Sequence, residues 1–234
     1  MKIEVLADAE AVAARAAAII ANHARAAFDA RGRFLIAVSG GHTPWVMLRV
    51  LAREKVPWGG VHVLQVDERI APAGHSDRNL THLLEVLEGA PLDPEQIYAM
   101  PVESPDPLGA AVDYSRTLEK MAGSPPILDL VHLGLGPDGH TASLVPGDPV
   151  LQVVDRDVAI TGFYQGRKRM TLTYPVINRA RQILWLVTGG EKANPLGHLL
   201  NADPAIPGGR ISQDQALVLA DRAAAGADKR RDIT

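Results

Sequence analysis

Short apolar runs alternate with helical stretches along most of this chain, and this alternation constrains the fold more than any other feature. Parallel strands need a crossover, usually a helix, to bring the chain back to the same end of the sheet. The pattern therefore predicts an α/β fold with a parallel sheet flanked by helices. We expect strands over residues 2–6, 34–38, 61–66, 97–100, 127–133, 158–161, 170–173, 182–187 and 216–220, and helices over residues 8–30, 44–51, 79–87 and 107–121.

The same alternation of strands and helices predicts the domain organisation. A chain of 234 residues is long enough for one large domain or two small ones. The proline-rich stretch 89–107 has the composition of a linker, but the strand expected within it and the helix expected after it continue the alternation. We therefore expect a single domain over residues 1–234, with a tail that frays from about residue 222.

The composition excludes several classes of partner. A net charge of −3 offers no electrostatic footprint for nucleic acid. Cysteine is absent, which excludes disulfides and thiolate chemistry and fits a reducing compartment. Glu4 and Asp8 interrupt the apolar run that a signal peptide needs, and the alanine-rich segment that follows is too polar for a membrane span. We expect a soluble cytoplasmic protein that binds neither nucleic acid nor membrane.

The strand expected over residues 127–133 runs into the strongest candidate for chemistry, the sequence GLGPDGHTAS at residues 134–143. Its glycines break the strand, so Asp138 and His140 stand at the carboxyl end, where open α/β sheets bind ligands. Thr141 and Ser143 are placed to cap a following helix or turn. Because a Gly-Pro-Asp-Gly string is also an ordinary turn, this stretch alone leaves a structural role open.

A second strand end has the features of a phosphate loop. The strand expected over residues 34–38 is followed by Ser39, Gly40 and Gly41, with Thr43 expected as helix cap and Pro44 at the first helical position. Glycines let the backbone approach an anion, and the free N–H groups of a helix start point at it. The sequence matches neither a Walker A loop nor a dinucleotide fingerprint, so we expect a single phosphate on a small molecule. The alternative is a plain strand-to-helix turn.

Charged residues follow two further strands. Asp67, Glu68 and Arg69 come directly after a buried run, and the planar guanidinium of Arg69 suits a phosphate or carboxylate. Asp67 or Glu68 could hold that arginine or a substrate hydroxyl, and the alternative is a surface salt bridge. Lys192 follows glycines after the strand expected over residues 182–187, where a phosphate-binding lysine would help. These features indicate an α/β enzyme for a small phosphorylated substrate.

The four blocks SGGHTP (39–44), VDER (66–69), GLGPDGHTASL (134–144) and TGGEKA (188–193) together resemble the 6-phosphogluconolactonase family. The resemblance covers nearly the whole chain and keeps the family's order. It implies hydrolysis of 6-phospho-D-glucono-1,5-lactone to 6-phosphogluconate, the second step of the oxidative pentose phosphate pathway. It also implies a Rossmann-like domain similar to glucosamine-6-phosphate deaminase and, more distantly, ribose-5-phosphate isomerase.

The same resemblance implies roles for individual residues. His140 matches the general base, Arg69 and Lys192 match basic residues at the substrate and its phosphate, and Gly40, Gly41 and Thr43 match the phosphate loop. Of the basic cluster at residues 167–169, we expect Arg169 rather than Arg167 to face the ligand, because it directly precedes a strand as arginine often does in the family. The complete set of expected substrate-binding residues is Ser39, Gly40, Gly41, Thr43, Asp67, Arg69, Asn79, Arg169 and Lys192. The chain departs from the family at Ile70-Ala71-Pro72, beside the loop near Asn79, and at Val145, where phenylalanine is common.

The chemistry follows from the substrate, since a lactone is an activated ester. Neutral His140 can take a proton from water and return it to the departing ring oxygen. Asp138 is a candidate to orient the imidazole, although two residues of separation do not establish contact. Arg69 and the loop N–H groups are both candidates for the oxyanion donor. We expect no cofactor and no metal, because the eight histidines form no zinc-binding spacing.

Two other functions remain as alternatives. A sugar-phosphate deaminase/isomerase of the same fold has a glutamate five residues after the histidine, where this chain has Val145. A non-catalytic sugar-phosphate sensor would need an output domain, for which the chain leaves no residues, and would have little use for the base His140. We expect a monomer or weak homo-oligomer whose partner is a small phosphorylated sugar lactone.

Overall fold

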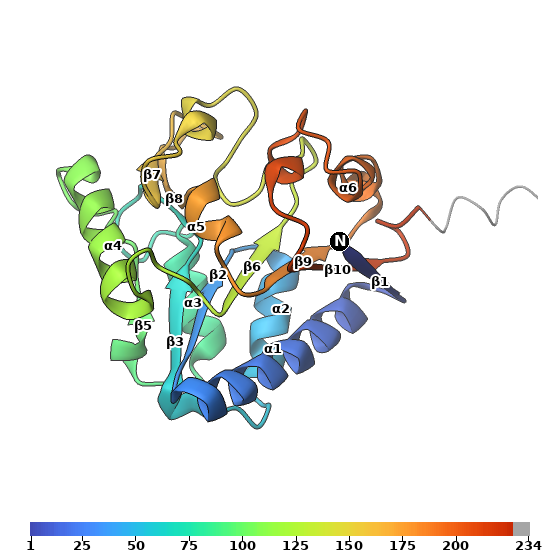
Figure 1. The fold of residues 1–234 in the computed structure, drawn as a ribbon, viewed down its shortest axis with the longest axis horizontal. Coiled ribbons are helices and arrows are strands. Elements are labelled where there is room, and N and C mark those ends of the chain that lie inside the picture. The colour runs from blue at the N-terminus through green and yellow to red at the C-terminus, as the bar shows by residue number, and fades with distance from the viewer. Residues whose placement is uncertain (227–234) are drawn as a thin grey trace, which may run out of the picture.

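A seven-stranded parallel sheet forms the centre of the computed structural model, which describes residues 1–226 (Figure 1). The strand order is β1-β10-β9-β6-β2-β3-β5, and every neighbouring pair is parallel. The strands are β1 (Lys2–Leu6), β2 (Phe34–Val38), β3 (Val61–Gln65), β5 (Ile97–Tyr98), β6 (Leu130–Gly134), β9 (Ile183–Val187) and β10 (Ala216–Asp221). The predicted α/β class and the parallel sheet are confirmed.

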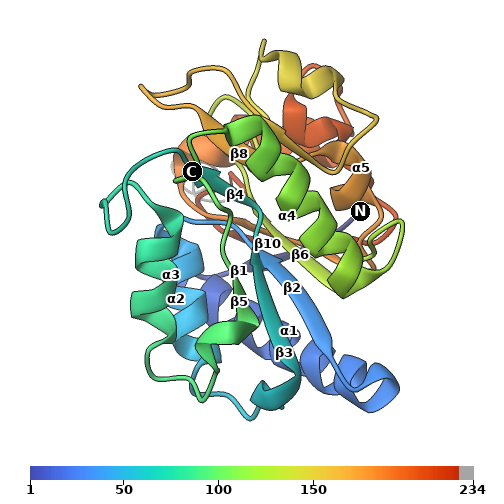
Figure 2. The ribbon, with the colours of Figure 1, turned by 90° about the vertical axis from the view of Figure 1, so that its left-hand side faces the viewer.

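Helices cover both faces of this sheet (Figures 1 and 2). One face carries α1 (Ala9–Arg31), α2 (His42–Leu51) and α3 (Asn79–Leu87), and the other carries α4 (Pro107–Ala122) and α5 (Tyr174–Asn178). Helix α6 (Ala193–Leu200) follows β9 and packs on the α4 side. Short 3₁₀ helices occupy Trp58–Gly60, Pro94–Gln96, Pro149–Gln152, Gly190–Lys192 and Pro207–Arg210.

The predicted long helix α1 shows how the sequence sets the ends of an element. Asp8 caps its start by accepting a hydrogen bond from the backbone N–H of Ala11 at 2.8 Å. Gly32 ends it in the left-handed conformation, at a φ of 69°, which a residue without Cβ adopts easily. The alanines of its inner face are small, so α1 lies close to both the sheet and α2.

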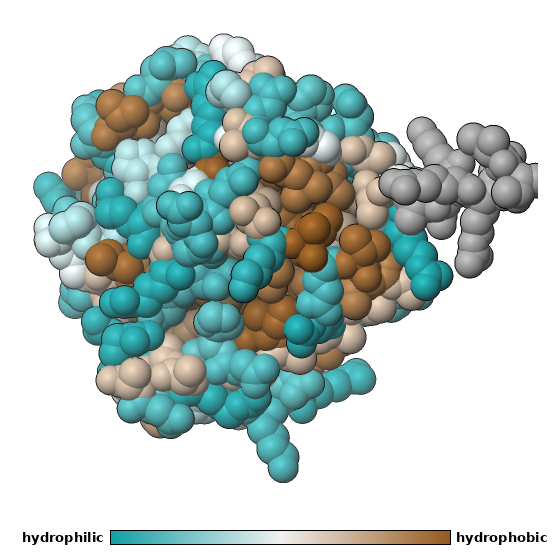
Figure 3. Space-filling view, turned by 45° about the vertical axis from the view of Figure 1, so that its right-hand side comes forward, coloured by the Kyte–Doolittle hydropathy of each residue, from teal (hydrophilic) through white to brown (hydrophobic). Residues whose placement is uncertain are grey.

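Strand β1 lies at one edge of the main sheet, because it pairs only with β10 among the described strands. Ile3 and Val5 on this strand are 41% and 47% exposed. Figure 3, which brings that side of the molecule forward, shows several apolar side chains among mostly hydrophilic ones. Within residues 1–226, no helix combines the length and apolar character needed to cross a membrane.

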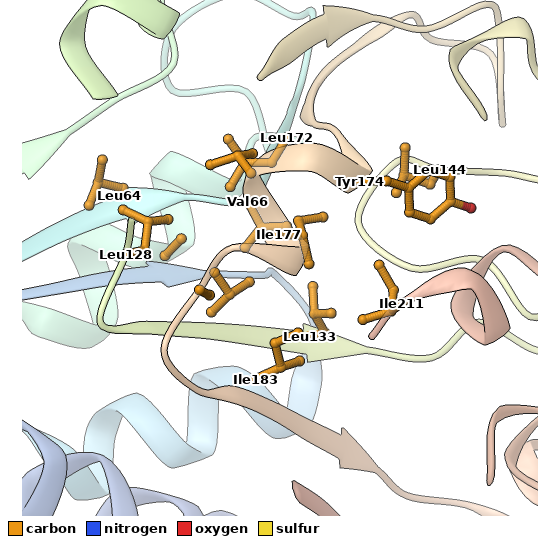
Figure 4. Packing of buried hydrophobic residues seen from close by; sticks show 14 of the residues in the cluster. Leu64, Val66, Leu128, Leu133, Leu144, Leu172, Tyr174, Ile177, Ile183 and Ile211 are labelled. Atoms are coloured by element: carbon orange, nitrogen blue, oxygen red, sulfur yellow. The ribbon is translucent and has the colours of Figure 1, made fainter. Parts of the chain in front are cut away.

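Alternating side chains of the strands divide the buried residues into two cores. On β2, Ile36 and Val38 face α1, α2 and α3, whereas Leu35 and Ala37 face the opposite layer. Figure 4 shows the second core, in which residues of the sheet such as Leu133 and Ile183 pack against Ile177 of α5. Because both faces are buried, the strands read as continuous apolar runs, which is why the sequence identified them.

A second, three-stranded antiparallel sheet lies on the α4 side, in the order β4-β8-β7. Its strands are β4 (Asp67–Arg69), β7 (Val158–Ile160) and β8 (Arg169–Leu172). The alternation of strands and helices did not predict it, because β7 and β8 are joined by a short loop rather than a helix. The strand expected over residues 61–66 ends at Gln65, and the chain then enters β4.

The end of the described chain is a hydrogen-bonded turn. The carboxylate of Asp221 accepts the backbone N–H of Ala224 at 2.7 Å, and the backbone N–H of Gly226 donates to the carbonyl of Ala223. Part of the tail expected to fray from about residue 222 therefore lies in this turn. Residues 227–234 lie outside the described residues.

Candidate active site

A pocket of about 380 Å³ lies beyond the carboxyl ends of β2, β6 and β9. Within the sheet, β3 lies on one side of β2 and β6 lies on the other, so the order in which the chain adds strands reverses at β2. The pocket therefore occupies a topological switch point. Ten of the expected site residues line it: Ser39, Gly40, Gly41, Thr43, Asp67, Arg69, Asn79, His140, Arg169 and Lys192. Asp138 does not line the pocket but contacts His140, which does.

The loop between β2 and α2 forms one wall of this pocket. A Cβ on Gly40 would overlap the side chain of Asn79, and Gly41 has a φ of 129°, so both positions require glycine. The expectation that Thr43 caps α2 is wrong, because the helix begins at His42 with Gly41 as N-cap. The Thr43 hydroxyl instead shares a hydrogen bond of 2.8 Å with the hydroxyl of Thr188.

That contact joins the first loop to the loop that carries Lys192. The backbone N–H of Gly189 donates to the carboxylate of Asp221 at 3.0 Å, which anchors the second loop to the end of β10. Lys192 follows in the 3₁₀ turn, with its Nζ 3.8 Å from the nearer carboxylate oxygen of Glu191. A cation therefore lines the pocket together with the glycine loop, as the sequence predicted.

His140 and Asp138 are in direct contact, which their spacing alone did not establish. One carboxylate oxygen of Asp138, Oδ1, lies 2.5 Å from Nδ1 of His140 and also accepts the backbone N–H of His140 at 3.1 Å. Partial burial opposes ionisation, but these hydrogen bonds and the charge of His140 hold the pKa of Asp138 below its usual value. A carboxylate only accepts, so Nδ1 carries the proton of this contact, and in the neutral imidazole Nε2 keeps the free lone pair.

Tyr164, which the sequence analysis missed, completes this cluster. Its hydroxyl donates to the second carboxylate oxygen of Asp138, Oδ2, at 3.1 Å, and its ring meets the ring of His140 edge-on at 5.4 Å between centroids. Burial and the neighbouring Asp138 charge raise the pKa of Tyr164. An aromatic residue in a loop carries no catalytic signal in a single sequence, so only the tertiary structure reveals it.

Two arginines form the opposite wall. Arg169 is 4% exposed, and one Nη donates to Gln165 at 3.1 Å. Its burial, together with the charge of Arg69, lowers the pKa of Arg169. The guanidinium of Arg69 donates to the carbonyl of Asp77 at 2.6 Å. Within residues 1–226, the Nε atoms of both arginines are buried without a hydrogen-bond partner, which leaves donor capacity for an anion.

The structure also separates the two arginines of the basic cluster. Arg167 binds the carboxylate of Asp77 at 2.6 Å and does not line the pocket, whereas Arg169 does. The placement agrees with the expectation that Arg169 rather than Arg167 faces the ligand.

The acidic residues after β3 have roles that differ from those expected. Asp67 lines the pocket and accepts the hydroxyl of Ser143 at 2.5 Å, so Ser143 is not a cap. Glu68 is fully buried and pairs with Arg78 at 3.1 Å rather than with a substrate group. Of the two roles considered for these carboxylates, holding the Arg69 guanidinium or a substrate hydroxyl, the first is wrong, because the guanidinium donates to the carbonyl of Asp77.

Thr141 is not a cap either. Its backbone pairs with that of Leu144 in a tight turn, and no helix follows at this point of the described chain. The turn packs against the small sheet through Ser143, whose backbone N–H donates to the hydroxyl of Thr171 and whose hydroxyl donates to Asp67.

The fold and this site together define an α/β protein with a cation-lined pocket at a topological switch point, beside a histidine in contact with a carboxylate. Comparison with known proteins gives the family. The chain belongs to the family described as glucosamine-6-phosphate isomerases/6-phosphogluconolactonase, whose model matches residues 7–219. The family predicted from the four sequence blocks is confirmed.

Individual relatives agree with this assignment. A 6-phosphogluconolactonase of Synechocystis is 37% identical over 225 residues, which cover 93% of each chain. The crystal structure of 6-phosphogluconolactonase from Thermotoga maritima is 26% identical and superposes with a TM-score of 0.84, covering 94% of this chain and 98% of that one. A monomeric glucosamine-6-phosphate deaminase shares the fold, with a TM-score of 0.83 over 97% of this chain and 99% of the other, at 18% identity.

Proposed function

We propose that this protein is a 6-phosphogluconolactonase, which hydrolyses 6-phospho-D-glucono-1,5-lactone to 6-phosphogluconate in the oxidative pentose phosphate pathway. The observation that carries the proposal is His140, which is paired with Asp138 and lines the same pocket as a glycine loop and three cationic side chains. Relatives from Synechocystis, Nostoc and the rat, which are 33–37% identical over 89–97% of this chain, bear this name.

The pocket suggests how the substrate is held. The phosphate binds to the N–H groups of the loop at residues 40–43 and to Lys192. The hydrogen bond between Thr43 and Thr188 keeps this loop and the loop of Lys192 together. This anchor places the lactone carbonyl near His140. Much of the rate enhancement then comes from holding the reacting carbon in position.

The chemical step uses His140 as general base. Its Nε2 takes a proton from water as the oxygen attacks the lactone carbonyl, while Asp138 stabilises the imidazolium that forms. Arg169, whose buried guanidinium has an unpartnered Nε within residues 1–226, stabilises the oxyanion together with Arg69. The imidazolium returns the proton to the ring oxygen as the C–O bond breaks, and the open-chain acid is released.

We further propose that residues 1–234 act as one catalytic domain, because the pocket uses residues from both sheets, including Arg169 of β8 and His140 after β6. The protein acts on its small-molecule substrate in the cytoplasm, as a monomer or weak homo-oligomer. Light scattering during gel filtration tests the oligomeric state, and a stable larger assembly would contradict it.

The test of the function is lactone hydrolysis. The substrate is generated in place by glucose-6-phosphate dehydrogenase, the product is read by 6-phosphogluconate dehydrogenase, and spontaneous opening is subtracted. The wild type should accelerate hydrolysis, and His140→Ala should lose most of that acceleration, at least about 100-fold, while 6-phosphogluconate still raises its melting temperature. A wild type that binds this ligand but does not accelerate hydrolysis would overturn the proposal.

A deaminase of the same fold is tested in parallel. Val145, five residues after His140, is buried and apolar, so this position cannot transfer a proton. Release of ammonia from glucosamine 6-phosphate should therefore stay at background. Ammonia release above background, without lactone hydrolysis, would favour the deaminase.

A further inference from the structure

The loop between β7 and β8 holds Tyr164 in a fixed position. The backbones of Tyr164 and Arg167 exchange two hydrogen bonds, at 2.9 and 3.2 Å. Gln165 and Gly166 between them have φ values of 51° and 79°, the positive pair found in the tightest hairpin turns. The turn therefore presents the Tyr164 side chain from a defined backbone rather than from an open loop.

That side chain contacts three groups of the site at once. Its hydroxyl donates to Oδ2 of Asp138, and its ring edge meets His140. The guanidinium carbon of Arg169 lies 4.9 Å from the centre of the same ring, within range of a cation–π interaction. Tyr164 itself does not line the pocket, so its effect on a bound substrate passes through these neighbours.

We propose that Tyr164 is a positioning residue: its hydroxyl fixes the Asp138 carboxylate that holds His140, and its ring fixes Arg169 at the pocket wall. The inference rests on the proposed lactonase function. Oδ1 of Asp138 already accepts two hydrogen bonds from His140, so the bond to Oδ2 sets the remaining orientation of the carboxylate. With the carboxylate fixed, His140 keeps its proton on Nδ1 and its lone pair on Nε2.

The two parts of the side chain have separable effects. Tyr164→Phe removes the hydroxyl but keeps the ring, so it should lower kcat about fivefold and leave KM within about twofold, the size expected for one hydrogen bond. Tyr164→Ala also releases Arg169, so it should in addition raise KM about tenfold. Phe163→Ala is the matched control, because Phe163 lies on the same loop, is 75% exposed and pairs its ring with the ammonium of Lys168.

A readout independent of activity separates this inference from the proposed function. The Nδ1 proton of His140, shared with Asp138, should give a downfield proton resonance that is assigned by its loss in His140→Ala. The resonance should shift in Tyr164→Phe and stay unchanged in Phe163→Ala. An unshifted resonance in Tyr164→Phe, or kinetic constants equal to those of the wild type, would overturn the positioning role. If the wild type lacks lactonase activity, the proposed function fails, and the resonance alone still tests the position of Tyr164.

Discussion

The space available for a single atom decides whether His140 and Asp138 can form their pair. Gly136 packs so closely against His140 and Asp138 that a Cβ at this position would overlap the imidazole. The loop closes when the backbone N–H of Gly136 donates to the carbonyl of His140 at 2.8 Å. Glycine is therefore required by the close approach of its own neighbours rather than by a positive φ.

We expect Gly136→Ala to displace the imidazole and to lower kcat at least about 100-fold, because misplacement by about 1 Å costs that much. Far-ultraviolet circular dichroism should show an unchanged fold, since the substitution lies in a loop. Gly197→Ala is the control, because nothing lies within 4 Å of an added Cβ on that exposed helix position. Full activity in Gly136→Ala would contradict the geometry of the pair.

The buried His132 makes stability depend on pH. It is fully buried on β6, and its Nδ1 accepts the backbone N–H of Ser39 at the start of the glycine loop at 3.3 Å. Burial lowers the pKa of His132 to about 3. The native state then binds fewer protons than the unfolded state below pH 6.5, so stability is complete above that pH and falls as the pH drops toward 3.

Between pH 7.5 and pH 5 we expect His132 to account for a loss of about 2 kcal/mol in the free energy of unfolding. Urea titrations at both pH values measure it. In His132→Leu, the free energy of unfolding should no longer show this loss between pH 7.5 and pH 5, whatever the stability of the variant at pH 7.5. An identical pH dependence in both proteins would show that His132 does not contribute.

Strand β4 links the main sheet, the small sheet and helix α3. Both oxygens of the buried Glu68 on this strand accept hydrogen bonds from the first backbone N–H groups of α3, at Asn79 and Leu80, each at 2.8 Å. The same carboxylate pairs with Arg78. A negative charge at the start of a helix is stabilising, and here it also fixes where the helix attaches.

Glu68→Gln should therefore cost about 3 kcal/mol in the free energy of unfolding, because it leaves the buried Arg78 without its inner partner. Urea titration measures this loss. Glu103 is the outer partner of the same arginine, and its own side chain is 55% exposed. Glu103→Gln should therefore lower the free energy of unfolding by less than about 1 kcal/mol. Equal losses in the two variants would contradict the importance of burial.

The pocket lies where the two sheets of the molecule meet. Residues of the main sheet's loops and residues of the small sheet line it together, and the bond between Asp67 and Ser143 joins the two walls. A ligand in the pocket therefore contacts segments that are far apart in the chain. Binding should stabilise the whole fold rather than one loop.

At a concentration 100 times its dissociation constant, 6-phosphogluconate should add about 2.7 kcal/mol and raise the melting temperature by about 5–10 °C. Lys192→Ala should weaken binding about tenfold and roughly halve the stabilisation at the same concentration. Gluconate, which lacks the phosphate, is the control ligand. An equal shift with gluconate would show that the phosphate is not the main anchor.

The local sequence was sufficient for most of the fold and for the candidates of the site. Buried parallel strands are continuous apolar runs, and helix ends carry recognisable caps, so elements such as β2, β9 and α1 could be predicted to within one or two residues. The four blocks sufficed for the family and contain eight of the ten expected residues that line the pocket, whereas Asn79 and Arg169 lie outside them. These features depend on residues that are close together in the chain, so a single sequence is enough to identify them.

The tertiary structure decided what depends on residues distant in the chain. The pairing of β4 with β8 created the second sheet, and Thr43 contacts Thr188 while Gly41 takes the cap position of the helix. Tyr164 reaches Asp138 from 26 positions away, and Glu68 turned out to be a buried helix anchor rather than a ligand group. Hydrogen bonds of this kind join segments whose approach is set by packing of the whole chain, so no local pattern encodes them.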